Sequence, residues 1–210
     1  MDYFTDMFAK RTACMLYQAI PGPDSENSTS WVGGNAPAYF DNQDIHEGDQ
    51  TYYFYLSLVN PFKPGSMISI FIPAEYDDYL DNNIYPRCSI KVFEHPASTE
   101  SAKDRFTHPG LVKHAISDGK LSDDREAMDQ SFFIKLGGNP RLIQEEDYYF
   151  KSLKEESLSF LFQVDEDGYP DTLLQDDWSY PFGFGALYIF ANFGTEEEIQ
   201  TPVAGFWQFS

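Results

Sequence analysis

The chain has 210 residues and is 42% hydrophobic, with 19 Phe, 14 Tyr and 3 Trp, which excludes an intrinsically disordered protein. Its 34 Asp and Glu against 14 Lys and Arg give a net charge of −20, which disfavours direct nucleic-acid binding because phosphates are repelled. No stretch is long and apolar enough to span a bilayer, so we expect no membrane contact. The start lacks the positive region of a secretory signal, and two cysteines, Cys14 and Cys88, are too few for a disulfide framework. We therefore expect a cytoplasmic protein whose two thiols are buried and reduced.

The N-terminal part predicts a short helix and then a strand. Residues 3–10 place Phe4, Met7 and Phe8 on one side of a helix. Residues 12–20 are rich in apolar side chains and are typical of a strand.

The next part of the chain predicts a hairpin and a third strand. Strands are expected at residues 52–59 and 67–72, joined by a Pro- and Gly-containing loop. Residues 88–93 alternate apolar and polar side chains, which predicts another strand. An irregular connection over 94–110 and a strand over 111–117 follow, and then a surface loop or short helix over 118–130.

The C-terminal part predicts a helix between strands. Residues 145–157 would form a helix with Tyr149, Phe150 and Leu153 inward, and the strand 158–164 would end at the turn Asp165-Glu166-Asp167-Gly168. Residues 169–184 form an insertion, and strands are expected at 186–190 and 203–209. Together these elements predict a β-rich α+β fold with mostly antiparallel strands.

Three sequence blocks occur twice in the same order. Gly33-Gly34-Asn35-Ala36-Pro37 is echoed by Gly137-Gly138-Asn139-Pro140, and each is followed by an aromatic strand and then a second strand. We interpret this as an internal duplication. Residues 30–93 and 131–193 would be two similar units, packed as one globular domain over residues 1–210.

The two Gly-Gly-Asn corners have two interpretations. Their backbone amides could form a nest for an anion, or the glycines could serve only to turn the chain after a strand. We favour the structural interpretation.

Signatures of catalysis and metal binding are missing from the sequence. The histidines (His46, His95, His108 and His114) do not have the spacing of a zinc site. Phosphate-binding loops, nucleophile elbows and dinucleotide fingerprints are also lacking. We predict a non-enzymatic protein without catalytic residues, cofactor or metal.

The acidic residues are unevenly distributed. Lys and Arg are missing between Arg11 and Lys63 and after Lys154. The final segment holds eleven acids: Glu155, Glu156, Asp165, Glu166, Asp167, Asp171, Asp176, Asp177, Glu196, Glu197 and Glu198. This charge either keeps an aromatic-rich protein soluble or attracts a basic protein. Because acids and aromatics coincide in the insertion, we predict partner contacts at Asp176, Asp177, Trp178 and Tyr180.

Four motifs in this order resemble the YwqG-like family, a bacterial family of unknown function, over about Trp31 to Phe193. They are the two Gly-Gly-Asn corners, Phe160-Leu161-Phe162-Gln163-Val164-Asp165 and Gly185-Ala186-Leu187-Tyr188-Ile189-Phe190. The resemblance implies an immunity protein from a polymorphic-toxin locus, such as those linked to type VI secretion. Its partner would be a cognate secreted toxin, most simply a basic nuclease effector. The alternative is a small-ligand or peptide-binding module that uses the cleft between the two units, with the Gly-Gly corners at its rim.

Overall fold

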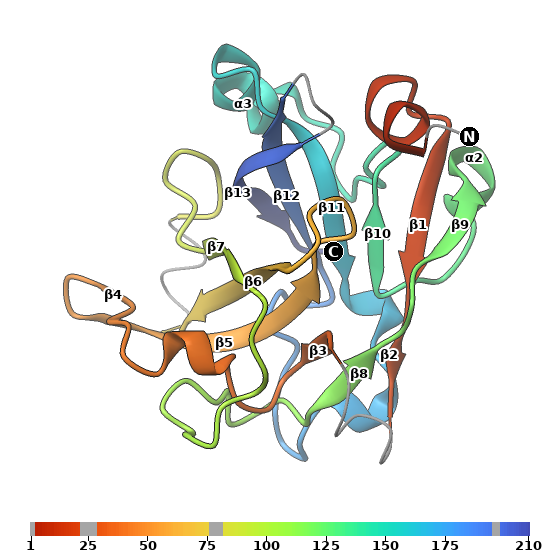
Figure 1. The fold of residues 1–210 in the computed structure, drawn as a ribbon. Coiled ribbons are helices and arrows are strands. Elements are labelled where there is room, and N and C mark those ends of the chain that lie inside the picture. Colours follow the sequence, from red (N-terminus) through yellow and green to blue (C-terminus); the bar gives the residue numbers. More distant parts are fainter. Residues whose placement is uncertain (1–2, 22–28, 76–81, 195–197) are drawn as a thin grey trace.

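Two antiparallel β-sheets make up the structure, a computed structural model that describes residues 3–21, 29–75, 82–194 and 198–210 (Figure 1). Sheet A has, in spatial order, β13 (Ile199–Gln208), β12 (Ala186–Phe193), β11 (Ser159–Asp165), β10 (Ile134–Leu136), β1 (Ala13–Tyr17) and β9 (Lys120–Asp123). Sheet B has β2 (Ala19–Ile20), β8 (His114–Ile116), β3 (Trp31–Val32), β5 (Gln50–Val59), β6 (Ser66–Pro73) and β7 (Lys91–Pro96), and β4 (His46–Glu47) pairs with β5. The predicted β-rich class with mostly antiparallel strands is confirmed.

Helices in the described residues are short. They are a π-helical turn at Thr5–Ala9, 3₁₀ turns at Ala38–Phe40, Asp147–Phe150, Glu166–Gly168 and Asp171–Leu173, and the α-helices α2 (Asp124–Ala127) and α3 (Lys151–Glu155). As predicted, the first turn buries Met7 and Phe8, and the later helical segment buries Tyr149 and Leu153. In the part of the chain that the structure describes, no helix has the length and apolar character needed to cross a membrane.

One two-stranded ribbon belongs to both sheets. The chain runs from β1 in sheet A directly into β2 in sheet B, and β8 in sheet B leads back through a short connection to β9 in sheet A. These segments pair antiparallel, with Met15 opposite Leu121 and Ala19 opposite Ile116. The ribbon therefore joins the sheets along one side, and the outer strands β7 and β13 meet on the other side.

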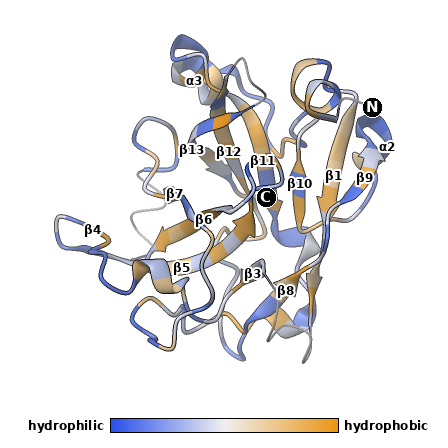
Figure 2. Ribbon diagram, viewed as in Figure 1, coloured by the Kyte–Doolittle hydropathy of each residue, from blue (hydrophilic) through white to orange (hydrophobic). Residues whose placement is uncertain are grey.

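The main core lies between the sheets. Alternation along each strand sends one set of side chains into this core, such as Leu56 and Ile70 from sheet B and Phe162 and Ile189 from sheet A. The alternate positions, such as Phe54, form separate clusters on the outer faces. The strands are apolar and the outlying loops are hydrophilic, so burial of apolar surface favours this layered arrangement (Figure 2).

One prediction about secondary structure is wrong in its bounds, and another is incomplete. The strand expected at residues 88–93 begins at Lys91, and it extends to Pro96 within the connection expected to be irregular. The preceding residues instead approach β13, where the Tyr85 N–H donates to the Gly205 carbonyl at 2.6 Å. Residues 118–130 contain β9 as well as the short helix α2. The strand β9 escaped prediction because it is an edge strand whose side chains are mostly exposed and show no apolar alternation.

The two sheets have matching local geometry at the glycine corners. The first corner follows β3, which pairs with β5, and the second corner follows β10, which pairs with β11. The N–H groups of Gly33 and Gly137 donate to the carbonyls of Tyr55 and Leu161, both at 2.8 Å. Each acceptor lies at the register shift of its strand. The repeated sequence blocks thus adopt the same turn in both sheets.

Substitution of Gly138 tests how tightly its corner is packed. Gly138 has φ +65°, and a Cβ there would lie 1.9 Å from Asp124 Oδ1. Gly48 has a similar φ of +60° but open space around it, which makes it a matched control. We expect Gly48→Ala to lower the free energy of unfolding by about 1–2 kcal/mol through backbone strain alone. Gly138→Ala should cost about 3 kcal/mol or more because it also displaces a buried ion pair. Equal losses in chemical denaturation would contradict this packing.

Candidate functional site

The insertion between β11 and β12 forms a loop that is fastened to sheet B. We call residues 166–185 the acidic loop. His114 Nε2 and Thr172 Oγ1 are hydrogen bonded at 2.8 Å, and the Val112 N–H donates to the Leu173 carbonyl at 2.8 Å. A third bond joins the Gln175 N–H to the Gly110 carbonyl at 3.0 Å. These contacts hold the loop in one position across the ends of both sheets.

A buried carboxylate organises the two ends of the acidic loop. Glu166 is 1% exposed, and its two oxygens accept the N–H groups of Phe182 and Gly185 at 2.8 and 2.9 Å. Burial raises the pKa of Glu166 to about 8, although these N–H donors favour the charged form. Glu166 therefore links the start of the loop to the turn that leads into β12.

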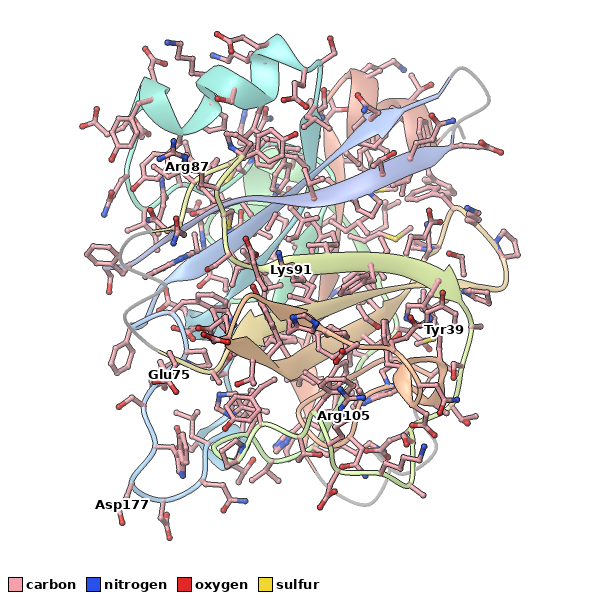
Figure 3. The ribbon with its side chains drawn as sticks, turned by 90° about the vertical axis from the view of Figure 1, so that its left-hand side faces the viewer. Tyr39, Glu75, Arg87, Lys91, Arg105 and Asp177 are labelled. Atoms are coloured by element: carbon pink, nitrogen blue, oxygen red, sulfur yellow. The ribbon has the colours of Figure 1, made fainter. Side chains whose placement is uncertain are left out.

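Three of the four predicted contact residues are exposed together. Asp176, Asp177 and Trp178 follow one another at the outer turn, and Figure 3 shows Asp177 at the lower edge of the molecule. Trp178 is 47% exposed, and its ring packs on Gly110 and meets the His108 ring edge-on at 5.7 Å. Its orientation is therefore fixed while half of its surface stays accessible.

Tyr180, the fourth predicted residue, is half-buried and contacts other neighbours. It stacks between Tyr169, at a ring distance of 5.4 Å, and Phe184, at 4.0 Å. Tyr169 is hydrogen bonded to Tyr55 in the core, with 2.5 Å between the two hydroxyls. Tyr180 thus connects the core to the exposed Phe184 instead of pointing out beside Trp178.

Two further exposed aromatic residues were not predicted as partner contacts from the sequence. Phe184 is 58% exposed with φ +62°, and Phe209 is 45% exposed. Between them, Gly183 has φ +62°, and a Cβ on it would make only an ordinary van der Waals contact with Phe209 Cβ, at 3.8 Å. The signal available was a phenylalanine between two glycines, Gly183 and Gly185, at the end of the insertion. Phe209 carries no comparable signal of exposure in the sequence. We expected it to continue the last strand, which ends at Gln208.

The acids after Lys154 fall into distinct groups. Asp165 and Glu166 are buried, Asp165 in an ion pair with Arg141 at 2.7 Å. Glu196 and Glu197 lie outside the described residues. The other seven are exposed and form no ion pair with described residues: Glu155, Glu156, Asp167, Asp171, Asp176, Asp177 and Glu198. Four of these seven lie in the acidic loop.

Acids in the first half of the chain are often neutralised by nearby cations. Asp44 pairs with Arg105 at 2.8 Å, Glu94 with Lys63 at 2.9 Å, and Glu47 with Lys91. The acidic loop has no such neighbour among the described residues. Its negative charge is therefore open to an external partner.

The first glycine corner is occupied by a side chain of the protein itself. Glu100 accepts the Asn35 N–H at 2.9 Å with one oxygen and Lys113 Nζ at 2.7 Å with the other. A carboxylate thus occupies the place that an anion would take in a backbone nest.

The second corner repeats this arrangement with different residues. Asp124 accepts the Asn139 N–H at 3.1 Å and Lys135 Nζ at 2.6 Å, and Lys135 is fully buried. At both corners the Asn N–H is therefore satisfied internally by a carboxylate. This agrees with the structural interpretation of the Gly-Gly-Asn motif and leaves no free nest at Asn35 or Asn139.

Possible nucleophiles are held in unreactive surroundings. Burial raises the pKa of Cys14 to about 11 and that of Cys88 to about 12, so both thiols stay protonated. Ser69 Oγ lies 2.7 Å from His95 Nε2, which resembles a nucleophile and its base. Ser69 is fully buried, and its hydroxyl also bonds to Ser57 at 2.9 Å, so this pair ties strands together. No group of three or more potential metal ligands occurs in the described ranges.

Comparisons with known proteins add no relative. The chain matches no protein-family model, and no curated protein matches its sequence. The resemblance to the YwqG-like family stays a prediction.

The pH dependence of stability tests the role of Glu166. Its raised pKa means that its contribution is fully present below about pH 4.5 and is lost as the pH rises through 8. The free energy of unfolding should fall between pH 5 and pH 8, by at most about 1.4 kcal/mol per unit of pKa shift. The free energy of unfolding of Glu166→Gln should not fall in this way. The side-chain NH₂ of the glutamine would face a backbone N–H donor, so the variant should also be less stable by an amount that does not depend on pH. The assignment would be contradicted if the free energies of unfolding of the two proteins changed in parallel between pH 5 and pH 8.

Proposed function

We propose that this protein is a cytoplasmic bacterial immunity protein that binds and neutralises a cognate secreted toxin. The toxin would be a basic nuclease effector, and the acidic loop would cover its active site. The observation that carries the proposal is the combination of unneutralised carboxylates and exposed aromatic rings on one anchored loop.

Charge complementarity supports a basic partner. Asp167, Asp171, Asp176 and Asp177 form no ion pair with the described residues, in a chain with a net charge of −20. A nuclease needs Lys and Arg to hold phosphates, so an acidic inhibitor competes for the same groups and associates quickly.

The exposed rings supply binding energy that charge alone lacks. Trp178 and Phe184 are 47% and 58% exposed, and aromatic residues are common among the strongest contacts of protein interfaces. Both are fixed by their packing, on Gly110 and on Tyr180. A pre-organised loop loses little conformational entropy on binding, which favours high affinity.

The matching corners and strand pairings support the predicted duplication. They do not favour a ligand site with the corners at its rim, because Glu100 and Asp124 already occupy both corners. The groove between β7 and β13 does not have the corners at its rim either, because its described lining contains no residue of either glycine corner. We therefore keep partner binding as the main proposal.

Removal of the predicted contacts tests the proposal with the product of the adjacent gene as the toxin. Replacing Asp176, Asp177, Trp178 and Tyr180 together by alanine should raise the dissociation rate at least 100-fold, since two strong contacts are worth about 2 kcal/mol each or more. Surface plasmon resonance measures the rate, and co-expression reports whether cells survive the toxin.

A matched control separates the loop from total charge. Glu126→Ala with Asp129→Ala removes two exposed acids near α2, far from the acidic loop, and should leave the dissociation rate unchanged (Figure 1). The proposal fails if the protein neither binds nor protects against the toxin. An unchanged rate in the quadruple variant would exclude this surface.

A further inference from the structure

A polar pocket of about 390 Å³ opens beside β7, on the face shown in Figure 3. Tyr52 of β5 and Lys91 of β7 contribute to its wall, together with Arg87 and Ser89 from the segment before β7. Its volume lies within the range of small-molecule sites. The acidic loop takes no part in its described lining.

Of the two cations in the described lining of this pocket, only one is paired with a described carboxylate. Lys91 pairs with Glu47 and lies 5.6 Å from the centre of the Tyr52 ring. Arg87 is exposed and has no ion pair with any described residue. The described lining therefore carries one uncompensated guanidinium, in a chain whose net charge is −20. A guanidinium presents donors that match a carboxylate in a bidentate arrangement.

A buried hydroxyl in the same lining lacks a hydrogen-bond partner. Ser89 is 7% exposed, and its Oγ bonds to no described group. Most buried polar side chains are paired, and an unpaired one destabilises the fold. The oxygen itself is sealed from solvent, so a ligand in the pocket reaches it only when the Ser89 side chain rotates about χ1. In that rotamer the hydroxyl would donate to the ligand and the cost would be removed.

An apolar groove lies next to the polar pocket. It has a volume of about 190 Å³ and shares Pro86, Cys88 and Lys91 with the pocket. Val92 of β7 and Val203 of β13 are among its apolar lining residues, so it lies along the seam between the two sheets. A molecule that occupies both spaces needs a polar head and an apolar tail.

We propose that the pocket and groove bind an organic monocarboxylate. Its carboxylate is held by Arg87 and the Ser89 hydroxyl, and its apolar group lies in the groove between β7 and β13. A phosphate dianion fits less well, because Glu47 lies in the same lining and the second cation, Lys91, is already paired with it. This site is independent of the proposed toxin binding, which uses a different part of the surface.

Calorimetry with octanoate tests this site on the full chain. Octanoate should bind with millimolar or better affinity, and octan-1-ol and octyl phosphate should bind at least tenfold more weakly. Acetyl-Gly-Leu, compared with its C-terminal amide, shows whether a peptide terminus supplies the carboxylate instead. Binding of either carboxylate supports the site. The proposal would be overturned if neither carboxylate bound at a concentration of about 10 mM.

Variants of the two proposed contacts separate binding from folding. Arg87→Gln should weaken binding of the carboxylate at least tenfold. Arg125→Gln should not; Arg125 is another exposed arginine that forms no ion pair with a described residue. Ser89→Ala should weaken binding while leaving the free protein as stable or more stable, because it removes an unpaired hydroxyl. Unchanged affinity in Arg87→Gln would contradict the proposal, as would unchanged affinity in Ser89→Ala. Toxin binding by all three variants should stay at the wild-type level.

Discussion

Carboxylates that accept backbone N–H groups hold the turns of this protein. Glu100 and Asp124 do so at the two glycine corners, and Glu166 does so at the ends of the acidic loop. Each satisfies amides that a turn would otherwise leave unpaired, and at Glu100 and Asp124, which pair with lysines, the charged acceptor makes such bonds stronger. Glu100 and Asp124 are balanced by lysines, whereas burial raises the pKa of Glu166. Much of the internal architecture thus depends on acids that contribute nothing to the surface charge.

The remaining acids have a different relation to the fold. The ribbon shared by both sheets closes one side of the core, and the acidic loop spans from the end of sheet A to sheet B. Because that loop is fastened at several points, its carboxylates and rings keep a fixed spacing. A set of like charges held close together is costly for an isolated protein, and a basic partner relieves that repulsion. The same fold therefore separates structural acids from acids available for binding.

The sequence predicted much of the fold because its main strands have strong apolar and aromatic patterns. β5, β6, β11 and β12 all lie where expected, and the two Gly-Gly-Asn corners adopt matching turns. The strand β9 has no such pattern, since its single partner and exposed side chains remove the signal. At the loop, composition located Asp176, Asp177 and Trp178, but not the inward turn of Tyr180 or the exposure of Phe184. Tyr180 stacks on Tyr169, which is hydrogen bonded to Tyr55 in a distant part of the chain. The pocket likewise forms only when the fold brings Tyr52 beside Arg87 and Lys91.

Hydrogen exchange of the complex with the adjacent gene's product would show where the partner binds. It reports which backbone amides become protected when the partner binds, without any substitution that could disturb the fold. If the acidic loop covers the toxin, exchange should slow across residues 166–185 and change little at α2 and α3. Unaltered exchange in the acidic loop, with protection confined to another surface, would contradict the proposal.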